Sequence, residues 1–241
     1  MPNHDRNKSL LLEVIVSSVT DAIEAEQGGA ARLEIVRDLK RGGLTPPYEL
    51  VEKIRQAVDL PVRVMLRESE GFEISGEDEI QRLCVAAEEF ASLGVDGFVL
   101  GFLKAGEVDI ALTQRVLARV PHMRATFHHA FEAAKDQLSA LSVLKQLPQI
   151  DRVLSNGGID HLESRVQRLD RYERAAAPKL IVLAGGGLDG DAIVRIGCET
   201  RIREFHVGRA ARARFAVDGG VEASMVNGLV KKFGEIARLN K

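Results

Sequence analysis

The chain has 241 residues, of which 45% are hydrophobic and 28% are charged, and its formal net charge is −2. This composition is ordinary for a globular protein; no apolar run is long enough to cross a bilayer, and the 33 basic residues are scattered, so neither a membrane nor a nucleic acid is expected as a partner. The polar N-terminus does not resemble a secretory signal, and Cys84 and Cys198 form neither a metal-binding spacing nor a disulfide framework, so a cytoplasmic protein is expected.

Short runs rich in Val, Ile and Leu recur along the chain, and each leads through a polar or glycine turn into a helical pattern. The runs cover residues 11–17, 32–36, 62–67, 97–101, 124–130, 152–158, 179–187 and 204–208. Their number and the chain length match a single (β/α)8 TIM barrel of the α/β class. No linker-like composition interrupts the repeat, so we expect one barrel domain over residues 11–241 after a polar tail of residues 1–10.

Helical patterns fill most of the spaces between these strands. They cover residues 19–27, 48–58, 77–93, 109–120, 136–147 and 221–239. Two connections that follow strands are long and polar, at residues 37–47 and 68–76. Long loops after barrel strands are usually functional, and active sites of this fold lie at the C-terminal strand ends. The site is therefore expected at that end of the barrel.

Charged side chains are predicted inside the barrel. Glu13 and Glu34 share their parity along the strand with apolar residues, and branched apolar side chains normally fill such an interior. A buried carboxylate needs an ion pair, hydrogen bonds or a metal ion. Arg67, His128 and His206 lie on three other strands at matching depth.

Several interpretations of these five residues stay open. One is a buried ion-pair network in which Arg67 neutralises a glutamate. Another is a catalytic set, with Glu13 or Glu34 as the base, His128 or His206 as the acid or electrophile, and Arg67 holding an anionic group. A third is a divalent-metal site of Glu34, His128 and His206, because carboxylate and imidazole ligands suit Zn, Mn or Fe.

Glycine turns follow the last two strands. Gly185, Gly186 and Gly187 end the seventh strand, and Gly208 and Arg209 follow the eighth. Barrels of this class often hold a phosphate between these two loops, although glycines also simply permit tight turns. A small anionic or sugar-like ligand is expected here, with further contacts at the same end of the barrel from His129, Glu132, Ser155 and Asn156.

Six short strings carry a family resemblance. They are Leu-Glu-Val at 12–14, Arg-Leu-Glu at 32–34, Gly-Gly-Leu-Thr-Pro at 42–46, Thr-Phe-His at 126–128, Gly-Gly-Gly at 185–187 and Glu-Phe-His at 204–206. In order and spacing they resemble the CutC family from residue 11 to about residue 212. The resemblance implies a (β/α)8 barrel, a homo-oligomer and a link to copper homeostasis through Cu(I) binding.

The chain departs from the family pattern at the predicted ligand end. In Cu(I)-binding members, cysteines follow the first two glutamates by two residues, and here Ile15 and Val36 occupy those positions. Aliphatic side chains give Cu(I) no ligand, so copper is not expected as a cofactor. In the string at 127–132, His129 and Glu132 replace the family's Arg and Asp. These departures indicate a divergent branch with a different ligand.

Three functions follow from these observations. The first is an enzyme of isomerase, epimerase or lyase type that acts by acid/base chemistry on a small hydroxylated or phosphorylated metabolite. The second is a copper homeostasis protein that binds Cu(I). The third is a binding module that senses a metabolite without converting it.

Overall fold

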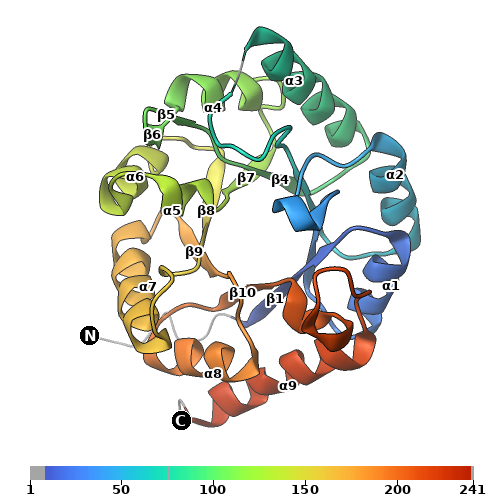
Figure 1. Cartoon of the computed structure of the whole chain (residues 1–241), viewed down its shortest axis with the longest axis vertical. Helices are drawn as coiled ribbons and strands as arrows, with labels where there is room; N and C mark the ends of the chain where they lie inside the picture. Colours follow the sequence, from blue (N-terminus) through green and yellow to red (C-terminus); the bar gives the residue numbers. More distant parts are fainter. Residues whose placement is uncertain (1–8, 75, 240–241) are drawn as a thin grey trace.

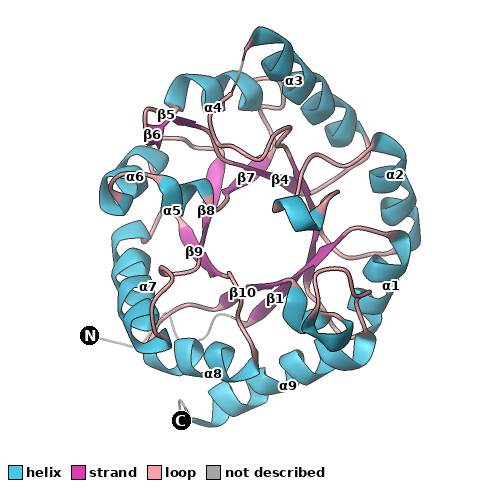
Figure 2. Ribbon diagram, viewed as in Figure 1, coloured by secondary structure: helices cyan, strands magenta, loops and turns pink. Residues whose placement is uncertain are grey.

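Eight parallel strands close into a barrel in the computed structural model, which describes residues 9–74 and 76–239. Around the barrel the strands are ordered β1, β10, β9, β8, β7, β4, β3 and β2. Figure 2 shows this ring of strands inside a ring of helices. The predicted (β/α)8 barrel is thus confirmed. The strands are β1 (Leu11–Val16), β2 (Arg32–Ile35), β3 (Val62–Met65), β4 (Gly97–Leu100), β7 (Arg124–Phe127), β8 (Ile150–Ser155), β9 (Ile181–Ala184) and β10 (Glu204–Val207).

The helices cover the outside of the barrel in chain order (Figure 1). They are α1 (Val19–Gln27), α2 (Tyr48–Ala57), α3 (Glu77–Ser92), α4 (Ile110–Leu117), α5 (Ala130–Ala133), α6 (Gln137–Leu144), α7 (Leu162–Ala176), α8 (Gly190–Glu199) and α9 (Ala223–Leu239). Several begin at a side chain that accepts a backbone N–H of the first turn, as Ser18, Asp109, Asp136 and Asp189 do. In the described part of the chain, no helix is long and apolar enough to span a membrane.

Some element boundaries differ from the sequence-based expectation. The strand expected over residues 124–130 ends at Phe127, because α5 begins only three residues later. The connection after β4 contains an unpredicted antiparallel hairpin of β5 (Leu103–Lys104) and β6 (Glu107–Val108). Its turn places Ala105 at φ +51°, a left-handed conformation that the sequence does not signal. Of the predicted N-terminal tail, residues 1–8 lie outside the described part.

Two kinds of core result from the alternation along the strands. Leu12, Val14 and Val16 are fully buried in the large apolar core that also contains residues of the helices. On the opposite face of the strands, Ile15, Val36, Met65 and Val99 form a small apolar cluster, with Leu39 packed against it. Charged residues stand two positions before Ile15, Val36 and Met65 on the same face, so the barrel interior is polar toward the N-terminal ends of the strands.

Candidate functional site

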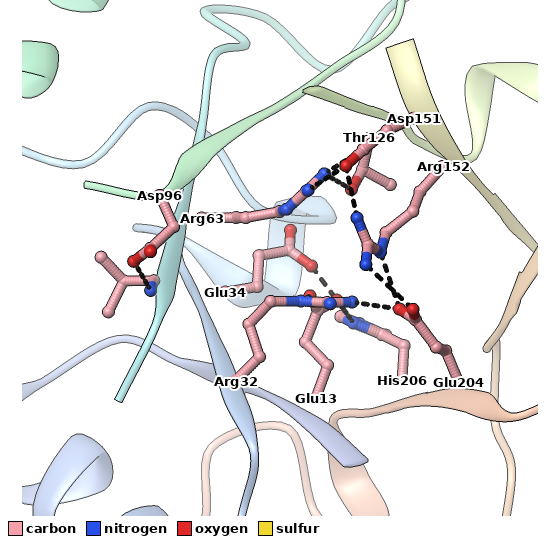
Figure 3. Close-up of polar contacts among 11 residues, drawn as sticks. Glu13, Arg32, Glu34, Arg63, Asp96, Thr126, Asp151, Arg152, Glu204 and His206 are labelled. Carbon is pink, nitrogen blue, oxygen red and sulfur yellow. Dashed lines mark hydrogen bonds and ion pairs between the residues drawn. The ribbon is translucent and has the colours of Figure 1, made fainter. Parts of the chain in front are cut away.

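An alternating chain of ion pairs lies inside the barrel, toward the N-terminal ends of the strands (Figure 3). Arg32 donates to Glu13 and, at 2.9 Å, to Glu204. Arg152 donates to Glu204 at 2.7 and 2.9 Å and also to its neighbour Asp151. Arg63 completes the series with two hydrogen bonds of 2.7 Å to Asp151. We call this series the interior ion chain; its members are Glu13, Arg32, Glu204, Arg152, Asp151 and Arg63.

The interior ion chain is electrically balanced. It contains three guanidinium groups and three carboxylates, and each carboxylate contacts at least one arginine. Strand register sets this order, because Glu13 lies opposite Arg32 on β2 and opposite His206 on β10. An unpaired charge at this depth would cost several kcal/mol, about 3–5 for a broken buried pair. Glu34 and His206 lie beside this chain, in contact with each other, and are not counted in its balance.

Glu34 and His206 are two buried titratable groups in contact with each other. The Nδ1 atom of His206 lies 2.8 Å from Oε1 of Glu13 and 3.3 Å from Oε2 of Glu34. Burial raises the pKa of Glu34 to about 7, and the nearby Glu13 carboxylate adds to the rise. Burial opposes the charging of His206, but Glu34 and Glu13 outweigh it and raise the pKa of the imidazole. The protonation states of the two groups are therefore linked, because each charge changes the pKa of the other.

Glu13 contacts His206 of this pair from the side of the N-terminal strand ends. It is 1% exposed, and although burial opposes its ionisation, Arg32 and His206 hold the pKa of its carboxyl well below the ordinary value. A carboxylate that stays ionised fixes the Nδ1–H of His206 and leaves the other ring nitrogen for a ligand.

A cavity of about 530 Å³ opens at the C-terminal strand ends, above this pair. Many of the predicted site residues line it: Glu34, Arg67, His128, His129, Gly186, Gly187, His206, Gly208 and Arg209. Parallel strands bring these residues together because all their C-terminal ends meet at one end of the barrel. Five predicted residues do not line it: Glu13, Glu132, Ser155, Asn156 and Gly185.

The predicted residues outside the lining hold the strand ends together. Glu132 accepts hydrogen bonds from Oγ of Ser155 at 2.7 Å and from the backbone N–H of Asn156 at 2.8 Å. Gly185 donates its N–H to the carbonyl of Ser155 at 2.8 Å. A Cβ atom on Gly185 would lie 2.6 Å from Cδ1 of Leu154, so a larger residue there requires the leucine side chain to move. These residues position the loops that reach the cavity.

Arg67 lines the cavity but does not neutralise a buried glutamate, which corrects the ion-pair interpretation. Arg32 takes that role, because it extends from the strand next to Glu13. The guanidinium of Arg67 instead donates to the carbonyls of Gly42 and Glu70 and lies 4.9 Å from the ring centroid of Phe72. Arg67 thus ties the two long loops together at the mouth of the barrel.

The two loops after β9 and β10 present donors to the cavity. Gly186 and Gly187 have φ of +75° and +74°, and within the described residues their backbone N–H groups meet no acceptor. A Cβ atom on Gly186 would lie 2.4 Å from Cβ of Asn156, so this turn requires glycine for its packing as well. Arg209 is exposed, and no acidic group of the described chain pairs with it. Both loops are thus open to an anion.

The comparisons with known proteins decide the family. The CutC family model matches residues 10–211. The chain belongs to the CutC family. It is 32% identical to a CutC family protein of Xylella fastidiosa over 81% of this chain and 73% of that protein. It is also 32% identical to the human copper homeostasis protein cutC homolog, over 88% of this chain and 76% of the human one. A CutC crystal structure from Streptococcus agalactiae shares the fold at 22% identity and a TM-score of 0.77, covering 83% of this chain and 98% of the other.

The cavity of this CutC family member is a poor match to Cu(I). Soft Cu(I) prefers thiolate and thioether ligands. The lining residues include one sulfur atom, in Met65, while Cys84 and Cys198 lie on the outer helices α3 and α8. Burial raises the pKa of both thiols, which disfavours the thiolate form that binds metal.

The predicted divalent-metal set also differs from what the structure brings together. Among the described residues, the potential ligand atoms that lie within 4.8 Å of one another belong to Glu13, Glu34 and His206. His128 is not in this group; its Nδ1 atom accepts the backbone N–H of Ala130. A cation bound to the group would also compete with the guanidinium of Arg32 for Glu13.

Sequence reasoning missed two sets of residues. Arg32, Arg63 and Arg152 share the parity of the inward residues on their strands, so alternation could have identified them. Phe72 lines the cavity from an irregular loop and Phe215 from a three-residue 3₁₀ turn, and neither segment is long enough or regular enough for a periodic pattern to place a side chain.

Proposed function

We propose that the cavity binds a small hydroxylated or phosphorylated anion, and that Glu34 and His206 move a proton on it in a reaction of isomerase, epimerase or lyase type. One observation carries the proposal. The charges of the interior ion chain neutralise one another, whereas Glu34 and His206 share a contact of 3.3 Å and both line the cavity. A merely structural pair would not need to face a cavity of this size.

The two groups suit opposite roles. Glu34, with its pKa raised to about 7 by burial, is a stronger base than an ordinary carboxylate and is matched to proton transfer near neutral pH. His206, whose pKa is raised by Glu34 and Glu13 against the effect of burial, suits the acid that returns the proton. Environments that separate the functions of two neighbouring titratable groups are typical of acid/base sites.

Anion binding is supported from the other side of the cavity. The N–H groups of Gly186 and Gly187 and the guanidinium of Arg209 have no partner among residues 9–74 and 76–239, and they lie on the two loops that hold phosphate in many barrels. A phosphate or carboxylate there would gain charge-assisted hydrogen bonds. The reacting carbon would then lie deeper, toward Glu34.

Two measurements test the proposal. Calorimetry measures binding of lactate, pyruvate, glycerol 3-phosphate and dihydroxyacetone phosphate to the wild type, and ¹H NMR in D₂O follows deuterium incorporation into each compound that binds. We expect binding and exchange of at least one compound, weaker binding by R209M, and loss of exchange but not of binding in E34Q. The variant E49Q changes an exposed glutamate on α2 and should behave as the wild type. Absence of binding across the panel, or exchange that persists in E34Q, contradicts the proposal.

A metabolite-binding module without catalysis is separated by the same experiment. Such a module would bind a compound of the panel through Arg209 and the glycine loops, yet no deuterium would enter that compound. Binding without exchange in the wild type therefore favours the sensor and removes the catalytic role of Glu34.

Copper handling is the second candidate, because the human relative is named a copper homeostasis protein. The residues of this cavity offer Cu(I) imidazoles and the thioether of Met65 but no thiol. Titration with Cu(I) against a chromophoric chelator tests this function. We expect no stoichiometric binding that survives the chelator; tight binding of one Cu(I), lost in M65L, would favour the copper role instead.

A further inference from the structure

The imidazole of His128 holds a hydrogen-bond donor for which the described protein supplies no acceptor. His128 is 3% exposed and lines the cavity. Its Nδ1 atom accepts the backbone N–H of Ala130 at 3.1 Å, so in the neutral ring the proton resides on Nε2. Nε2 is buried and has no hydrogen-bond partner among the described residues. A buried donor of this kind costs free energy unless a ligand accepts a hydrogen bond from it.

The ring is held in this orientation from several sides. The ring of Phe72 packs against it with centroids 5.4 Å apart. Gly101 makes room for it, since a Cβ atom there would lie 2.5 Å from Nδ1. The backbone N–H of His128 donates to the carbonyl of Leu100 at 2.9 Å, which anchors the residue at the end of β4. The donor is therefore fixed before a ligand binds.

The ring also stays uncharged. Burial lowers the pKa of His128 well below its ordinary value, and the positive charges of Arg67 and His129 add to the effect. A neutral donor suits an oxygen that is uncharged in the bound substrate and gains charge only during the reaction. A permanent anion is better served by the guanidinium groups of Arg67 and Arg209, which line the same cavity.

These features assign a substrate class. Building on the proposed acid/base function, we infer that the metabolite carries a carbonyl group whose oxygen accepts the Nε2–H of His128, next to the carbon that Glu34 deprotonates. The C–H bond breaks and its proton moves to the Glu34 carboxylate. The electron pair forms a C=C bond, and the carbonyl becomes an enolate oxygen that His128 stabilises. Return of the proton to the same carbon completes an epimerisation. Where that carbon also carries a hydroxyl group, transfer of the hydroxyl proton to the enolate oxygen and return of the carbon-bound proton to the former carbonyl carbon complete an isomerisation. Neither reaction needs an oxidant.

A hydroxyl group in place of the carbonyl would use His128 less well. A hydroxyl oxygen can accept the same hydrogen bond, but it gains no negative charge when a neighbouring carbon is deprotonated. The inference therefore predicts discrimination between carbonyl compounds and their hydroxyl counterparts.

The first test needs no ligand. Long-range ¹H–¹⁵N NMR of the wild type, with the His128 signals assigned by their loss in H128Q, reports the tautomer and charge of the ring. We expect a neutral ring with the proton on Nε2 between pH 5.5 and 8. A proton on Nδ1, or an imidazolium in this range, overturns the inference.

The second test compares matched compounds by calorimetry: pyruvate with lactate, hydroxypyruvate with glycerate, and dihydroxyacetone phosphate with glycerol 3-phosphate. We expect the carbonyl member of at least one pair to bind the wild type about tenfold more tightly, the scale of one well-placed hydrogen bond. H128F should lose this preference, and H128Q, whose amide can still donate, should keep part of it. H122F replaces an exposed histidine outside the cavity lining and should keep the preference in full.

The outcomes separate this inference from the proposed function. Binding and exchange of a compound without any carbonyl preference, or a preference that H128F retains, overturns the carbonyl assignment and leaves the acid/base proposal in place. Failure of the whole panel to bind the wild type contradicts both. If H128F does not fold, two measurements still test the carbonyl assignment: the ratio of carbonyl to hydroxyl affinity in H128Q, and the tautomer of His128 in the wild type by NMR.

Discussion

Replacing Arg32 by methionine is expected to destabilise the barrel strongly. The Arg32 side chain is 5% exposed and bridges two carboxylates, Glu13 at 1% and Glu204 at 11% side-chain exposure. Methionine keeps most of the apolar stem but removes the charge. Breaking a buried ion pair in this way costs about 3–5 kcal/mol, against a total stability of about 5–15 kcal/mol for a typical domain. For a chain of this size the melting temperature should fall by about 6–20 °C.

The loss should also depend on pH in a defined direction. Burial opposes ionisation of Glu13 and Glu204, yet the arginines hold the pKa of both below the ordinary value of 4.5. Their contribution to stability is therefore present above pH 4.5 and lost as the pH falls through the lowered values. In R32M this contribution is reduced. The difference in unfolding free energy between the wild type and R32M is thus largest near pH 7 and shrinks below pH 4.5.

Urea denaturation at pH 7 and at pH 3.5 measures both effects through the midpoint, provided that the slopes agree. The matched control is R195M on α8, which removes an ion pair whose side chains are 40% and 49% exposed. An exposed pair of this spacing contributes about 0.3–0.5 kcal/mol. The reasoning is refuted if R32M is no more destabilised than R195M at pH 7, or if its loss is the same at both pH values.

Two further variants test the upper part of the site. In the folded protein burial raises the pKa of Glu34 from 4.5 to about 7, so the stability contributed by its protonated form is complete below pH 4.5 and lost as the pH rises through 7. E34Q should therefore gain stability relative to the wild type between pH 5 and pH 8, and parallel urea midpoints across that range would contradict the assignment. G186A and G94A both place alanine at positive φ, but only the first meets a neighbouring Cβ, at 2.4 Å. We expect G186A to cost about 1–3 kcal/mol more than G94A in urea unfolding; equal losses would show that the turn relaxes.

The barrel could be predicted from the sequence because its signal is repeated eight times. Each apolar run and each helix repeats the same pattern, so an error at one boundary does not change the count. The boundaries themselves were less certain. The run from Thr126 through Ala130 contains no proline or glycine that would mark the end of a strand, and only the chain direction after Phe127 separates strand from helix.

The site was predictable in location but not in its pairings. Glu34, His128 and His206 line one cavity because the C-terminal ends of parallel strands meet wherever the exact register falls. Which cation reaches which carboxylate depends on the stagger between strands, and a single sequence does not contain the stagger. Arg32 stands two residues before Glu34 on the same face, yet it pairs with Glu13 on the next strand.

The balance of the interior ion chain has a consequence for ligand binding. Since its three arginines and three carboxylates cancel, the net charge beneath the cavity depends on the protons carried by Glu34 and His206. A bound anion adds negative charge above this pair and favours its more protonated form. Binding of a phosphorylated compound near pH 7 should therefore take up protons, and calorimetry in buffers of different ionisation enthalpy would measure the number. We expect uptake in the wild type and less in E34Q. Binding enthalpies that do not vary with the buffer would mean that the pair is not coupled to the ligand.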